Sequence, residues 1–281
     1  MSFATPMPEP GRGVPFPRAG LLFPASDGWD MPDEPPPPSL RGPAPAQRGA
    51  GGRNPRWIVA QQVSDALWER YGGYLQAVGV HGAVAHGDDT DVSDVEMIVV
   101  TRRATVGPAP VTRRVDGVIV DLAVIPADEL LGHARTLTTS WPLVADQYLT
   151  IKGLLDPDGW LPRLRDVHLT RLAHADGQLF AALAREAWCQ ATIAHGHARR
   201  MAELYEPEVA AMTLAEARLA VAMVEGLLTR TYFRNSADAV RRTGLAAAHL
   251  TDLGERLSIQ ARELAHRGRP VDGDIADLLG E

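Results

Sequence analysis

The chain of 281 residues contains almost no cysteine and almost no lysine. Its single cysteine, Cys189, excludes an intramolecular disulfide and any zinc site built from several cysteines. Lysine occurs once, at Lys152, so 27 of the 28 Lys and Arg residues are arginines. We attribute this bias to a GC-rich bacterial genome, and it says nothing by itself about mechanism.

The sequence also lacks a hydrophobic run of about 20 residues, the length needed to cross a bilayer. The first residues lack the basic segment and the following apolar segment that mark a secretory signal peptide. The formal net charge of −7 argues against a general nucleic-acid binder, although it does not exclude a local basic groove. We therefore expect a cytoplasmic protein with neither a membrane nor a nucleic acid as its partner.

Proline is distributed unevenly, because 13 of the 22 prolines fall within residues 1–54, four of them in a row at 35–38. Proline removes backbone donors, and this segment repeats no apolar stripe. The composition therefore predicts a disordered Pro/Gly-rich tail over 1–54. A docking tail that acts through its polyproline stretch is one interpretation, and an extension without a folded role is the other.

Regular structure is expected from about residue 55. Apolar residues at helical spacing predict a helix over 57–71, which Gly72 and Gly73 end. Runs rich in β-branched residues predict strands over 75–80, 95–100 and 118–125. Pro126 then opens a helix predicted over 127–137, which Trp141-Pro142 interrupts.

From about Leu161 onward the sequence predicts helices only, with breaks near 206–207, 235–236 and 268–270. We therefore predict an α+β fold. Its parts are a small α/β domain with a mixed sheet over 55–158 and an α-helical C-terminal domain over 159–281.

Three carboxylates are expected on one face of the predicted sheet. Asp94 and Glu96 are two residues apart on one strand, so both project from the same face, and Asp121 lies in another strand-like run. Carboxylates on an apolar sheet repel one another unless a cation neutralises them, and Mg²⁺ prefers such oxygen ligands. A metal site is one interpretation, and a solvent-facing acidic pair at a strand edge is the other.

A glycine turn precedes these carboxylates. Gly82 follows a predicted strand and lies 12 residues before Asp94. A turn of this kind lets the backbone approach a phosphate closely. The combination favours a nucleotide site over a purely structural turn.

This order of motifs resembles the polymerase-β-like nucleotidyltransferases, and more closely the kanamycin nucleotidyltransferase (aminoglycoside 4′-adenylyltransferase) family. The resemblance extends from about Trp57 to Ser236 and places Asp121 at the third metal-ligand position. The matching segments are Ala77-Val78-Gly79-Val80-His81-Gly82, Val92-Ser93-Asp94-Val95-Glu96-Met97 and Ser140-Trp141-Pro142-Leu143, with Gln147-Tyr148 behind the last.

The resemblance implies a nucleotidyltransferase domain followed by a helical domain, in a homodimer with its active site at the subunit interface. It implies transfer of AMP from Mg-ATP to a hydroxyl of an aminoglycoside, a reaction that confers antibiotic resistance. The implied metal ligands are Asp94, Glu96 and Asp121. The implied contacts to the nucleotide are Gly82, Ala83 and His86.

The chain departs from the family pattern at its phosphate loop and at its general base. Ala83 replaces a serine, and His86 replaces a basic residue, so that a protonated His86 could bind phosphate or a neutral one could have a plain hydrogen-bonding role. Gln190 stands where the resemblance places the general base, and Ala194 where it places a phosphate-binding lysine.

Two neighbours on the same helical stripe are candidates for the base. Glu186 and His197 lie four residues before and seven residues after Gln190, so the three share one face of a helix. Either could take the role of base, whereas a solvated surface position is the alternative interpretation of Glu186.

These departures leave two functions open. The first is an Mg²⁺-dependent adenylyl transfer from ATP to a small molecule. The second is a repurposed or catalytically lost member of the family that binds or cyclises a small molecule in a biosynthetic pathway. A nucleotidyltransferase acting on RNA or protein is a third hypothesis, and the acidic balance argues against it.

Overall fold

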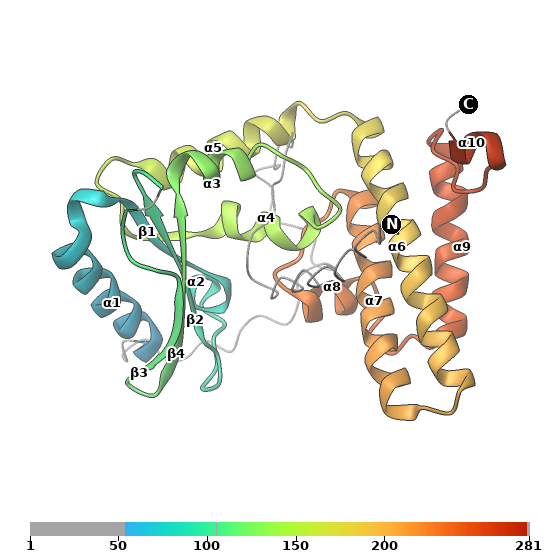
Figure 1. Ribbon diagram of the computed structural model, residues 1–281, viewed down its shortest axis with the longest axis horizontal. Helices are drawn as coiled ribbons and strands as arrows, with labels where there is room; N and C mark the ends of the chain where they lie inside the picture. Colours follow the sequence, from blue (N-terminus) through green and yellow to red (C-terminus); the bar gives the residue numbers. More distant parts are fainter. Residues whose placement is uncertain (1–53, 105, 280–281) are drawn as a thin grey trace, which may run out of the picture.

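The computed structural model describes residues 54–104 and 106–279 (Figure 1). The predicted disordered tail therefore lies outside the described residues, except for Asn54. Asn54 caps the first helix, because its side chain accepts a hydrogen bond from the Arg56 amide at 2.9 Å. Pro55 then occupies the first turn of this helix, where a missing N–H costs nothing.

The first part of the described chain forms a five-stranded mixed sheet with four helices and one short 3-10 helix. In chain order the elements are α1 (Pro55–Tyr71), η2 (Gly72–Tyr74), β1 (Leu75–His81), α2 (Gly82–His86), β2 (Val95–Thr101), β3 (Val111–Val115), β4 (Val118–Pro126), α3 (Ala127–His133), α4 (Trp141–Thr150) and β5 (Lys152–Leu155). The predicted helix over 57–71 and the three predicted strands are confirmed.

The strands lie in the order β3-β4-β2-β1-β5. Strands β2 and β4 are parallel, whereas the other neighbouring pairs are antiparallel. The connection between β2 and β4 passes through the edge strand β3, which hydrogen-bonds to β4 alone. The predicted α+β fold with a mixed sheet is therefore confirmed.

The rest of the chain is helical. Its elements are α5 (Trp160–Ala173), α6 (Gly177–Glu203), α7 (Pro207–Thr229), α8 (Ser236–Arg242), α9 (Leu250–His266) and α10 (Ile275–Leu279). Helices α6, α7 and α9 pack side by side, and α5 packs against α3, α4 and β1 (Figure 1). The predicted helix breaks near 206–207, 235–236 and 268–270 are confirmed.

The two faces of the sheet are covered differently. Helix α1 covers one face, where Val59 and Ala60 pack with Val80, Met97 and Val99. The other face carries the alternate strand residues, and its apolar part belongs to a buried core that continues through α3, α4 and α5 to α6, α7 and α9. Because one core crosses position 158, the domain boundary proposed there stays a prediction.

The segment Trp141-Pro142 corrects one prediction. It does not interrupt a helix but begins α4, since a proline in the first turn loses no hydrogen bond. Trp141 is fully buried and contacts Phe180 of α6 edge to face, with 5.2 Å between the ring centroids. The preceding helix α3 ends at His133, earlier than predicted.

Within the described residues, no helix is both long enough and apolar enough for a membrane crossing.

Candidate active site

A row of polar side chains crosses the sheet where β2 begins. Glu96 of β2 lies directly between Asp121 of β4 and His81 of β1, and Thr112 of β3 lies beside Asp121. Directly opposed residues of neighbouring strands project from the same face. We call Asp94, Glu96 and Asp121 the acidic row, because Asp94 directly precedes β2 and its charge acts on Glu96.

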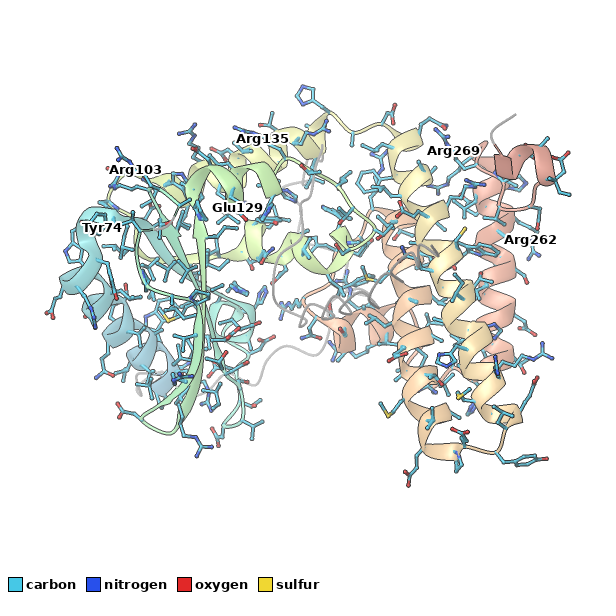
Figure 2. The ribbon with its side chains drawn as sticks, in the orientation of Figure 1. Tyr74, Arg103, Glu129, Arg135, Arg262 and Arg269 are labelled. Atoms are coloured by element: carbon cyan, nitrogen blue, oxygen red, sulfur yellow. The ribbon has the colours of Figure 1, made fainter. Side chains whose placement is uncertain are left out.

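The acidic row lies on the face of the sheet that is turned away from α1. Glu96 alternates with Met97, which packs toward α1, and shares its face with Ile98 two residues further along β2. In Figure 2, Tyr74 and Arg103 mark the opposite end of the sheet, where β1 begins and β2 has ended. The row is thus at one end of the sheet, on the face that packs against the remaining helices.

The pKa of Glu96 reveals an excess of negative charge in the row. Burial, as the largest cause, and the charges of Asp94, Asp121 and Asp146 together raise this pKa to about 7. His81 does not neutralise the row, because burial lowers its pKa to about 4 and leaves it uncharged at neutral pH. A bound cation would relieve the repulsion.

Gly82 makes close packing at the end of β1 possible. Its φ of +66° lies in the left-handed region, and a Cβ there would overlap the Oε2 atom of Glu96. The predicted glycine turn is therefore adjacent to the acidic row. Ala83 follows in α2 and is half-buried.

The acidic row has the donor chemistry for a divalent metal but does not converge as it stands. Within residues 54–104 and 106–279, no three His, Cys, Asp or Glu side chains are placed to hold one metal ion. The Asp121 carboxylate accepts a hydrogen bond from the Thr112 hydroxyl, and Glu96 packs on Gly82. Carboxylate oxygens with surplus negative charge fit Mg²⁺, so the metal site stays a prediction that requires these side chains to turn toward a common point.

His86 has a carboxylate partner that the sequence analysis missed. Its Nε2 atom lies 2.9 Å and 3.0 Å from the two oxygens of Asp146, a residue of α4. Asp146 is buried, and 14% of the His86 side chain is exposed. This contact agrees with the hydrogen-bonding interpretation of His86, whereas its predicted contact with phosphate stays a prediction. A single acidic residue within the apolar segment after Trp141 was the available signal, since a buried carboxylate requires a partner.

The loop between α7 and α8, residues 230–235, contacts α4 and the chain that follows α2. Its Phe233 amide donates a hydrogen bond to the Pro142 carbonyl at 2.6 Å, and Arg234 forms an ion pair with Asp88. Burial raises the pKa of Tyr232, and the charge of Asp146 adds to the rise. The sequence offered no signal that this loop belongs to the site.

The two candidate bases on α6 lie elsewhere in the chain. Glu186 and His197 are exposed, and α6 lies apart from the sheet, beside α7 and α9 (Figure 1). The charges that act on Glu96 come from Asp94, Asp121 and Asp146, not from α6. Within one chain the structure does not bring these residues to the acidic row, so their role stays a prediction that requires a second subunit.

Comparison with known proteins gives a partial match. No protein-family profile matches the chain. An aminoglycoside nucleotidyltransferase (4′) from Staphylococcus aureus is 25% identical over 114 residues, which cover 40% of this chain and 44% of that protein. A protein of the same description from a Bacillus species has the same identity and coverage. A solved nucleotidyltransferase-like protein from Exiguobacterium sibiricum is 14% identical, with a TM-score of 0.38 over 74% of this chain and 75% of that chain.

The chain thus matches less than half the length of these curated relatives. The resemblance inferred from its motifs is confirmed as a distant sequence similarity to aminoglycoside 4′-nucleotidyltransferases.

Proposed function

We propose that the protein transfers AMP from ATP to a hydroxyl group of a small molecule, with an aminoglycoside as the substrate class. The observation that carries this proposal is the acidic row, where burial together with the neighbouring negative charges raises the pKa of Glu96 to about 7. The partial similarity to aminoglycoside nucleotidyltransferases supports the same reaction class.

In this proposal Asp94, Glu96 and Asp121 hold Mg²⁺ through their oxygen atoms. The metal, when bound, stabilises negative charge on the transferred phosphoryl group. The chain's own contribution is positional, because β2 and β4 fix Glu96 and Asp121 side by side on one face, Asp94 directly precedes β2, and Gly82 leaves room for Glu96.

We further propose a homodimer, as the resemblance implies. Exposed Glu186 and His197 on α6 would then meet the acidic row of the partner subunit. Their exposure within one chain is consistent with this arrangement.

One observation favours the second function, a protein that binds or cyclises a small molecule. The basic groups beside the acidic row are engaged or uncharged: Arg234 is paired with Asp88, His86 with Asp146, and the pKa of His81 is about 4. A triphosphate needs cationic contacts in addition to its metal. A site poor in such contacts would favour an uncharged or cationic ligand.

A direct assay separates the two functions. The protein is incubated with Mg²⁺, ATP labelled at its α-phosphate and a panel of aminoglycosides, and both pyrophosphate release and label transfer are measured. Adenylyl transfer predicts both products, in amounts that depend on Mg²⁺ and on the acceptor. The second function predicts a thermal shift with an aminoglycoside or related molecule, without either product. Replacing exposed Asp166 of α5 by Asn provides a matched carboxylate control.

A further inference from the structure

We propose that His86, oriented by Asp146, is the general base that removes the proton from the acceptor hydroxyl. This inference rests on the proposed function, since it assigns the base for that transfer. It differs from the assignment of the base to Glu186 or His197 on α6.

The His86–Asp146 contact has the geometry of a catalytic dyad. Both oxygens of Asp146 lie within 3.0 Å of His86 Nε2, and an ionised carboxylate can only accept a hydrogen bond. Nε2 must therefore carry the proton of the neutral ring, which leaves the lone pair on Nδ1. Within the described residues only Nε2 of this ring has a hydrogen-bond partner, so Nδ1 is available to accept a proton.

Asp146 is held firmly enough to orient the ring. It is 3% exposed and lies in the middle of α4. Ala145 and Tyr148 of the same helix belong to the buried core that joins the sheet to the helices. A carboxylate fixed in this way selects one tautomer and stabilises the imidazolium that forms when the base accepts a proton. A buried carboxylate at position 146 carries a desolvation cost that an apolar residue would avoid.

The dyad is adjacent to the acidic row. Helix α2 begins at Gly82, which packs on Glu96, and ends at His86. At about 1.5 Å of rise per residue, His86 lies roughly 6 Å along the helix from Gly82. The charge of Asp146 acts on Glu96 and also on His81, the register partner of Glu96. The dyad and the acidic row therefore lie at the same end of the sheet.

Other elements contribute polar and ionisable groups around the dyad. Tyr232 and Arg234 come from the loop 230–235, and Asp88 comes from the chain directly after α2. His81 is buried at the end of β1. Asp88 and Arg234 form an ion pair with each other. Asp146 is the carboxylate that contacts the His86 ring directly.

The proposed step balances as follows. The acceptor oxygen forms a bond to the α-phosphorus of ATP while its proton passes to His86 Nδ1. The bond between the α-phosphorus and the bridging oxygen breaks, and pyrophosphate leaves with the electron pair. The imidazolium, stabilised by Asp146, then releases its proton to water. This step explains how Gln190 can occupy the position that the resemblance gives to the base.

Two substitutions of His86 distinguish a base from a phosphate contact. His86→Gln and His86→Arg should each lower kcat about 10²–10⁴-fold, the usual contribution of a general base, and leave the KM for ATP nearly unchanged. Arginine supplies a permanent cation, so a phosphate-binding role predicts that His86→Arg retains activity. Retained activity in His86→Arg would overturn the proposal. His266→Gln, at an exposed position of α9, is the matched control.

Asp146→Asn tests the positioning role. It should lower kcat without raising the KM for ATP, because the ring loses the carboxylate that orients it while the contacts to the nucleotide stay in place. If these variants fold poorly, nitrogen-15 NMR of the wild-type histidines gives a second measurement. A neutral His86 with its proton on Nδ1 would contradict the assignment.

The outcomes separate this inference from the proposed function. A wild-type protein that forms no product with any acceptor refutes the adenylyl transfer and the base assignment together. A wild-type protein that is active while His86→Gln keeps its kcat refutes the base alone. Loss of activity in both His86 variants, with full activity in His266→Gln, supports the assignment.

Discussion

The two faces of the sheet carry different kinds of side chain, contributed by alternate residues of the same strands. Met97 of β2 is fully buried against the α1 side, whereas its neighbour Glu96 projects from the other face into the acidic row. On the α1 face the buried side chains of β2 and β4 are apolar along both strands. On the other face they are apolar only as far as Ile98 and Ala123, and acidic beyond.

This difference shows that stability and chemistry can be separated within one strand. The α1 face excludes water, so its contribution to folding grows with the apolar area that it buries. The acidic row costs folding free energy unless its charges are neutralised. Substitutions in the acidic row and on the α1 face should therefore have opposite consequences, and the following predictions test that contrast.

The largest effect is expected for Asp94→Asn, on activity alone. If Asp94 holds the metal, the substitution should lower adenylyl transfer about 10³-fold or more, equivalent to about 4 kcal/mol of transition-state stabilisation. Because Asp94 is exposed, the melting temperature should change little. Pyrophosphate release and thermal unfolding measure the two quantities. An active Asp94→Asn protein, beside an equally active Asp166→Asn control, would refute the metal assignment.

The α1 face should respond in the reverse way to Met97→Ala. Truncation of a fully buried methionine removes apolar contacts and leaves a cavity, so the free energy of unfolding should fall by about 2–5 kcal/mol. Urea denaturation measures this loss. The kcat of the remaining folded protein should stay close to that of the wild type. A large change in kcat at unchanged stability would show that the two faces are not separable.

The acidic row should also give the protein a specific pH dependence in the absence of metal. The pKa of Glu96 is raised from 4.5 to about 7, so the folded state binds this proton more tightly than the unfolded state. Its contribution to stability is complete below about pH 4.5 and is lost as pH rises through 7. Relative to Glu96→Gln, the wild type should lose about 2–3 kcal/mol between pH 4.5 and 8.

His81 contributes to the pH dependence of stability with the opposite sign, so the comparison with Glu96→Gln is needed. Its pKa is lowered to about 4, so this histidine contributes stability above its unfolded value of 6.5 that is lost as pH falls toward 4. The two contributions partly cancel in the wild-type curve but not in the difference between wild type and Glu96→Gln. Urea denaturation of both proteins with a chelator, at pH 5 and pH 8, measures this difference. A difference that does not change with pH would contradict the raised pKa.

The local parts of this architecture were predictable from the sequence. Runs of β-branched residues identified β1, β2 and β4. The two-residue spacing of Asp94 and Glu96 predicted one shared face, which stays a prediction for Asp94 because β2 begins at Val95. The edge strand β3 was missed, because its exposed centre, Thr112 to Arg114, interrupts the apolar pattern that marks a strand.

The contacts between distant segments were not predictable. His86 and Asp146 are 60 residues apart, and the packing of α4 beside α2 brings them together. The loop 230–235 reaches the same region from the other end of the chain, through Arg234. Sequence periodicity reports which face of an element is buried, but not which other element covers it.

The smallest effect is expected where that loop meets the chain after α2. Arg234→Gln removes the ion pair with Asp88, and both side chains are substantially exposed to water, at 48% and 32%. Exposed ion pairs contribute about 0.2–1 kcal/mol, so the loss of stability should remain within that range and shrink at high salt. A double-mutant cycle with Asp88→Asn measures the coupling by urea denaturation. The Phe233–Pro142 hydrogen bond and the buried Phe233 ring hold the loop independently of this pair. A coupling above about 2 kcal/mol would therefore mean that the loop is held mainly by charge, and that the acidic end of the sheet stabilises the fold after all.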